Sequence, residues 1–184
     1  MLRRTAAFAT VLGLAVVLGV HAQNNLKSGP QVGQKVPGPF HPLNINGDSA
    51  GKKNCLYCAN AGNPVAVVFA RELTPEVAKL IRKLDEATVK NSGASMGSYA
   101  VFMSDSEKLP TDLKNLADKA NLQKLVLAVD NPAGPKAYDI AQNADVTVLL
   151  YNEFVVRANH AFRKGELHDS DITQVVNDVA KIVK

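Results

Sequence analysis

The chain has 184 residues, of which 46% are hydrophobic and 21% are charged, and this composition is typical of a globular domain. Of the 21 basic side chains, Arg3 and Arg4 lie at the extreme N-terminus, so 19 basic groups stand against 17 acidic ones in the rest of the chain. Basic and acidic side chains are thus nearly equal in number, and no basic stripe is present, so the sequence gives no support to nucleic-acid binding.

The first 22 residues have the pattern of an export signal. Arg3 and Arg4 precede an uncharged apolar run, which ends at Val20-His21-Ala22. We therefore expect a signal peptide over 1–22 with cleavage after Ala22, and an uncleaved anchor is the alternative. The run is short for a membrane span and has no stop-transfer flank, so the protein is expected to be secreted or periplasmic, without stable membrane insertion after cleavage.

A polar leader and a proline-rich segment precede the first buried strand. Residues 23–32 contain little apolar surface, so we expect a flexible leader there and one folded domain over 33–184. Pro37, Pro39 and Pro42 exclude a helix in the following segment and permit only irregular or edge structure.

Buried strands and amphipathic helices then alternate. Continuous apolar runs predict strands over 65–70, 98–103 and 125–129. A helix is predicted from Thr74 as N-cap and Pro75 as first residue to residues 91–93, with Asp85 on its polar face. Further helices are predicted after Thr111, over 135–142 and after Asp169 or Ser170, and a hairpin is predicted over 146–151 and 155–162.

This order predicts an α/β fold with a mainly parallel central sheet, helices on both faces, and a C-terminal antiparallel hairpin followed by a helix. The chain resembles the thioredoxin-like superfamily, and its peroxiredoxin and redoxin branch more than thioredoxin itself. The residues that carry the resemblance are Val32-Gly33, Val36-Pro37, Phe40, VAVVFA at 65–70, LVLAVDNPAGPKAYDI at 125–140 and VTVLLYNEFVV at 146–156.

The resemblance implies a reactive cysteine in the turn after the first central strand, where a helix N-terminus favours a thiolate. In this chain that turn contains Thr74 and Pro75 and no cysteine. Val146 stands where thioredoxins have a cis-proline, which peroxiredoxins also lack, and a trans peptide is expected there. Thr74, Pro75 and Val146 therefore form a degenerate family site, and peroxidase activity of the usual kind is not expected.

Both cysteines, Cys55 and Cys58, lie before this strand instead, in a C-x-x-C pair. An exported chain with two cysteines is expected to form a disulfide between them. Closing so small a loop contributes only about 2 kcal/mol to the stability of the fold, which favours a redox-active pair over a purely structural disulfide. Lys52 and Lys53 favour a thiolate, and Asn54 is a candidate cap for a short helix whose first residue is Cys55.

The residues around the pair argue against two other kinds of site. Covalent haem attachment requires a histidine after the second cysteine, and Ala59 stands there. A metal site needs three or four ligands, and His41, His160 and His168 are the histidines beyond the signal. Two thiolates and one histidine could together bind Cu(I), and this is the alternative, but we expect neither a metal nor a cofactor.

Two hypotheses of function follow. The first is an exported thiol-disulfide oxidoreductase that exchanges electrons with exported protein thiols or a redox partner protein, with an accessible Cys55 attacking and Cys58 resolving. The alternative is a non-catalytic binding or scaffold domain with a structural disulfide. The position of the cysteine pair relative to Thr74, Pro75 and Val146 decides whether the family site has been refilled.

Overall fold

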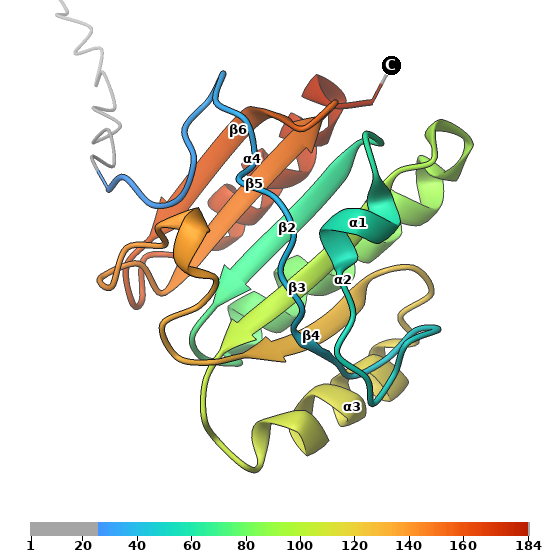
Figure 1. Ribbon diagram of the computed structural model, residues 1–184, viewed down its shortest axis with the longest axis vertical. Helices are drawn as coiled ribbons and strands as arrows, with labels where there is room; N and C mark the ends of the chain where they lie inside the picture. The colour runs from blue at the N-terminus through green and yellow to red at the C-terminus, as the bar shows by residue number, and fades with distance from the viewer. Residues whose placement is uncertain (1–25, 184) are drawn as a thin grey trace, which may run out of the picture.

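The computed structural model describes residues 26–183, so the expected signal peptide and its cleavage site lie outside the described residues. The strands form one six-stranded sheet in the order β1-β4-β3-β2-β5-β6 (Figure 1). Their bounds are β1 Leu43–Asn44, β2 Val65–Ala70, β3 Gly97–Met103, β4 Val126–Asp130, β5 Val146–Asn152 and β6 Val155–Phe162. Strands β2, β3 and β4 pair in parallel, and β1, β5 and β6 pair antiparallel to their neighbours. The predicted α/β fold with a closing hairpin is confirmed.

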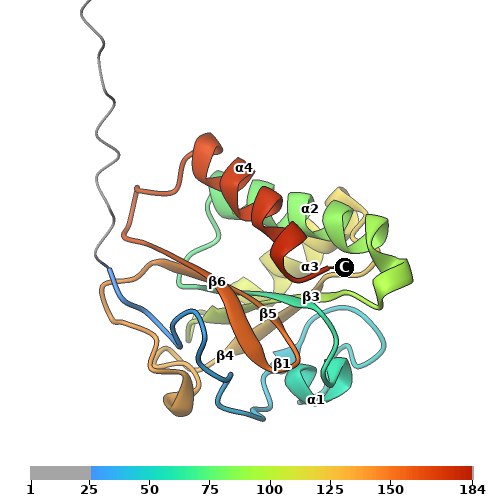
Figure 2. The ribbon, with the colours of Figure 1, turned by 90° about the horizontal axis from the view of Figure 1, so that it is seen from above.

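The helices cover the two faces of the sheet unequally. They are α1 Leu56–Asn60, α2 Pro75–Lys90, α3 Leu109–Ala120 and α4 Asp169–Asp178. Figure 2 shows α2, α3 and α4 together on one face and α1 on the other, where the proline-rich segment completes the cover. The steps from β2 to β3 and from β3 to β4 run in the same direction across the sheet, so right-handed crossovers place α2 and α3 on the same side.

Some element ends differ from the prediction. The helix expected over 135–142 is only the 3-10 turn Lys136–Tyr138, because Pro135 precedes it and Asp139 adopts a left-handed φ of 50° directly after it. Helix α3 begins at Leu109, two residues before Thr111. The N-cap of α4 is His168, whose backbone N–H donates to the Asp171 carboxylate at 2.9 Å.

Asp85 is buried, not on the polar face of α2 as predicted. It is 6% exposed, and its carboxylate accepts hydrogen bonds from the backbone N–H groups of Gln123, Lys124 and Leu125 at 2.7 to 3.2 Å. Asp85 thus ties α2 to the turn between α3 and β4, and its charge is compensated by backbone donors.

Contacts with the sheet begin before Gly33, the expected start of the domain. Ser28 is 1% exposed, and its hydroxyl lies 2.7 Å from that of Thr147 in β5. From β6, the Asn159 amide donates to the carbonyl oxygens of Ser28 and Pro30 at 2.9 Å. The polar residues of this segment are therefore hydrogen-bonded partners of the hairpin. Within residues 26–183, no helix is long and apolar enough to cross a membrane.

Candidate functional site

The two cysteines form a disulfide across the first turn of α1, with 5.2 Å between their Cα atoms. Cys55 is the N-cap residue, in place of Asn54, and its sulfur accepts a hydrogen bond from the Cys58 backbone N–H at 3.0 Å. Cys55 is 6% exposed, whereas Cys58 is exposed. The expectation of an accessible Cys55 is therefore wrong, because the N-cap position directs its sulfur against the helix while Cys58 lies one turn further along.

The anchors of α1 lie at the end of the sheet where β2 begins. Leu56 is buried in the core of this face. Tyr57 packs against Phe154 of the β5–β6 turn, with 5.3 Å between their ring centroids. The last residue of α1, Asn60, donates from its side-chain amide to the Leu56 carbonyl oxygen at 2.7 Å and lies against Gly97 at the start of β3. The pair therefore rests on the hairpin turn and on β3.

Buried tyrosines form much of the core on the α1 side of the sheet. The hydroxyls of Tyr99 and Tyr151 lie 3.4 Å apart, and the Tyr138 hydroxyl donates to the carbonyl oxygen of Gly38 at 3.0 Å. Burial raises the pKa of Tyr151 to about 12 and moves the pKa of Tyr99 well above its ordinary value. These phenols are therefore neutral at physiological pH.

The degenerate family site lies at the opposite end of β2. Val146 pairs with Ala70, the last residue of β2, and the Thr74 hydroxyl caps α2 by accepting from the Val77 N–H at 3.3 Å. As expected for Val146, the described residues contain no cis peptide bond. The six residues of β2 span roughly 17 Å from the α1 end to this end. The cysteine pair has not refilled the family site, and the chemistry that the resemblance implies there does not transfer to it.

Arg71 is the first residue of the turn that follows β2. Its guanidinium donates to three backbone carbonyl oxygens of the segment before β5, those of Pro132, Ala141 and Ala144, at 2.9 to 3.2 Å. Between this segment and Val146, Asp145 is partly exposed, and burial, with Glu72 as a second cause, raises its pKa. Arg71 thus fastens a loop over the end of the strand, a role that the sequence does not reveal.

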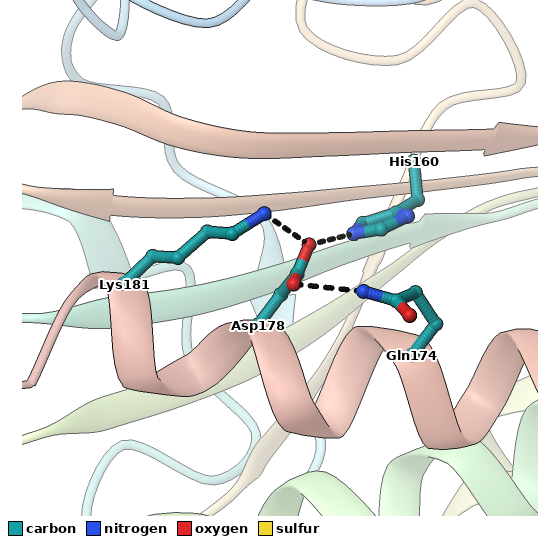
Figure 3. A network of polar contacts seen from close by, with 4 residues as sticks. All are labelled: His160, Gln174, Asp178 and Lys181. Atoms are coloured by element: carbon teal, nitrogen blue, oxygen red, sulfur yellow. Dashed lines mark hydrogen bonds and ion pairs between the residues drawn. The ribbon is translucent and has the colours of Figure 1, made fainter.

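The histidines lie in separate places. His160 Nε2 of β6 is 3.1 Å from Oδ2 of Asp178, which also accepts from Lys181 at 2.9 Å, while Oδ1 of Asp178 accepts from Gln174 at 2.9 Å (Figure 3). Burial lowers the pKa of His160 and outweighs the opposing effect of Asp178. His168 caps α4, and His41 is an exposed residue of the proline-rich segment. In the part of the chain that the structure describes, no three His, Cys, Asp or Glu side chains gather as a metal site would require.

The architecture has a thioredoxin-like fold, as comparison with known proteins shows. No protein-family model and no curated protein sequence matches the chain. Among solved structures, the chain is similar to a secreted disulfide oxidoreductase of Mycobacterium tuberculosis homologous to E. coli DsbE (TM-score 0.55, 11% identity, 75% of this chain and 94% of the other covered). It is also similar to the peroxidoxin BcpB of the same organism (TM-score 0.59, 12% identity, 86% and 99% covered).

A third similar structure is the thioredoxin domain of a thiol-disulfide oxidoreductase from Bacteroides vulgatus (TM-score 0.55, 15% identity, 79% and 99% covered). The predicted resemblance to the thioredoxin and redoxin folds is thereby confirmed. At these identities the likeness concerns the fold, and the function has to be argued from the residues of this chain.

The C-x-x-C spacing marks the cysteine pair in the sequence, but the residues that hold the pair have no such mark. Tyr57 has the pattern of any apolar residue, and Phe154 that of a hairpin turn. One signal for Phe154 was available. A two-residue hairpin turn usually contains glycine or asparagine, and Glu153-Phe154 contains neither.

Proposed function

We propose that the protein is an exported thiol-disulfide exchange protein that acts through Cys55 and Cys58 on the thiols or disulfides of exported partner proteins. The observation that carries the proposal is the exposure of Cys58 within a disulfide that spans only one helical turn. A partner thiolate can reach the Cys58 sulfur without disturbing the core. The similar structures named as disulfide oxidoreductases share the fold, so the exchange is argued from the cysteine pair of this chain.

The exchange runs through a mixed disulfide on Cys58. A partner thiolate attacks the Cys58 sulfur, the intramolecular bond breaks, and its electron pair passes to the Cys55 sulfur. The second thiolate of the partner then releases Cys58, so that the partner dithiol is oxidised to a disulfide while this pair is reduced, with two electrons transferred. In the reverse direction Cys58 attacks and Cys55 resolves, which exchanges the roles expected from the sequence.

The local structure suits Cys55 to the leaving role. Its sulfur accepts the Cys58 N–H at 3.0 Å, and a backbone donor at a helix start favours negative charge on sulfur. Lys52 and Lys53 are exposed just before the pair and add positive charge to the segment. Export belongs to the proposal, because a stable disulfide in such a pair requires an oxidising compartment.

Trapping experiments test these roles. Cys55→Ser leaves the exposed Cys58, so it should accumulate a mixed disulfide with a partner thiol, whereas Cys58→Ser leaves the buried Cys55 and should trap little. The reduction potential of the wild-type pair, measured in glutathione buffers, is expected in the range of exchange proteins. A potential well below about −300 mV, where structural disulfides lie, would refute the proposal.

The second candidate is a binding or scaffold domain with a structural disulfide. The observation that favours it is the position of the pair, at the end of the sheet opposite to Thr74, Pro75 and Val146. Replacing both cysteines by serine separates the candidates. A loss of about 2 kcal/mol of stability with unchanged partner binding would support the scaffold, and a loss of exchange activity with intact folding would support the redox protein.

A further inference from the structure

The turn between β5 and β6 has an unusual backbone. It consists of Glu153 and Phe154, and both have positive φ angles, 51° and 63°. Tight hairpins with two such residues favour asparagine and glycine, because a side chain in the left-handed region meets its own backbone. For a residue as bulky as Phe154 this conformation is strained, so contacts elsewhere must hold it.

Those contacts lead directly to the disulfide. The Phe154 ring packs on Tyr57, which lies between the two cysteines in sequence. The Phe154 carbonyl oxygen accepts from the Val36 N–H at 2.8 Å, and the Glu153 N–H donates to the carbonyl oxygen of Gly62, just after α1, at 3.0 Å. The turn is therefore fastened to Val36 and to the segment just after α1, and its aromatic contact is with the helix that carries Cys58.

Helix α1 in turn depends on the disulfide. It has five residues, and a helix of that length is not stable in water without outside support. The bond between Cys55 and Cys58 closes its first turn, so reduction removes a covalent support and leaves the packing of Leu56 and Tyr57. If α1 loosens on reduction, the Tyr57–Phe154 contact is weaker in the reduced protein than in the oxidised one.

We propose that the β5–β6 turn is a second component of the cysteine site, in which Phe154 acts through Tyr57 as a positioning residue and sets how readily the disulfide is reduced. The inference rests on the proposed exchange at Cys58, whose regulation it describes. Coupling between two elements is reciprocal. If oxidation strengthens the contact, the contact stabilises the oxidised form, and its removal makes the disulfide easier to reduce.

The test is a redox titration of the full chain in glutathione buffers, with the reduced fraction measured by alkylation and mass spectrometry. Phe154→Ala and Tyr57→Ala should each shift the equilibrium about threefold to tenfold toward the dithiol, which is about 15 to 30 mV for a two-electron couple. Glu153→Ala is the matched control, because this residue shares the turn and the positive φ but makes no ring contact, and it should shift the equilibrium less than twofold.

Two further variants are measured in the same redox titration. The double variant of Phe154 and Tyr57 should shift the equilibrium no further than either single variant, since both remove the same contact. Phe154→Leu keeps an apolar side chain and replaces the alanine variant if that one does not fold. Shifts no larger than that of the Glu153 control would overturn the inference while leaving exchange at Cys58 intact. A wild-type pair that no partner thiol attacks would overturn the exchange itself, whatever the variants show.

Discussion

Asp85 gives the sharpest test of how the domain is held together. Its carboxylate receives the N–H groups of Gln123, Lys124 and Leu125, and the Leu125 donor is itself buried. In Asp85→Ala, the buried Leu125 N–H loses its partner, which costs about 1 to 3 kcal/mol, while the two part-buried donors can turn to water at about 0.5 kcal/mol each. We therefore expect a loss of about 3 kcal/mol in the free energy of unfolding.

The assay is urea unfolding followed by circular dichroism, with the slope compared between variants to confirm that the denatured state is unchanged. Asp85→Asn keeps one acceptor oxygen and the shape, so it should cost about half as much. Glu86→Gln is the matched control, because its exposed ion pair with Lys83 contributes about 0.5 kcal/mol or less. If Asp85→Ala destabilised the protein no more than this control, the bonds to the 123–125 turn would not be what stabilises it.

Three further predictions concern other parts of the molecule. Because burial lowers the pKa of His160, the unfolded state binds a proton more readily than the folded state, and stability should fall as the pH drops below about 6.5, the ordinary pKa of histidine, toward the lowered pKa of His160. His160→Gln should flatten this profile in thermal melts, and the exposed His41→Gln should not. Gly97→Ala places a methyl group on the Asn60 side chain and should cost about 1 to 3 kcal/mol in urea unfolding, with recovery when Asn60→Ala is added; a cost unchanged by that addition would contradict the clash. Arg71→Ala frees three carbonyl oxygens and should cost about 2 kcal/mol while making the 132–144 segment more sensitive to limited proteolysis; equal proteolysis rates would rule out the clamp.

The sequence was sufficient for the framework of the fold. The apolar runs at 65–70 and 146–151 have no polar alternation, and strands buried on both faces need none, so their type and order could be predicted. The short helix expected over 135–142 was wrong, because local periodicity over a few residues competes with proline and with tertiary contacts.

Polar residues with distant partners could not be placed. Asp85 bonds to residues 38 to 40 positions away, and Arg71 bonds to carbonyl groups 61 to 73 positions away. Such a side chain has the same local pattern as a solvated one, so the sequence predicts a polar face for Asp85 and no particular role for Arg71. The cysteines could be recognised as a pair because their spacing is local. The burial of Cys55 and the exposure of Cys58 depend on distant residues, so they required the folded chain.

The unequal cover of the sheet has a dynamic consequence. Within residues 26–183, three helices of ten or more residues shield one face, whereas no helix longer than five residues shields the other. Segments with few regular hydrogen bonds open at a lower free energy than the domain as a whole. We therefore expect amide hydrogens of α1 to exchange with solvent through local openings, long before those of β2 and β3 beneath it. Such openings would expose both sulfurs of the disulfide while the central sheet stays folded.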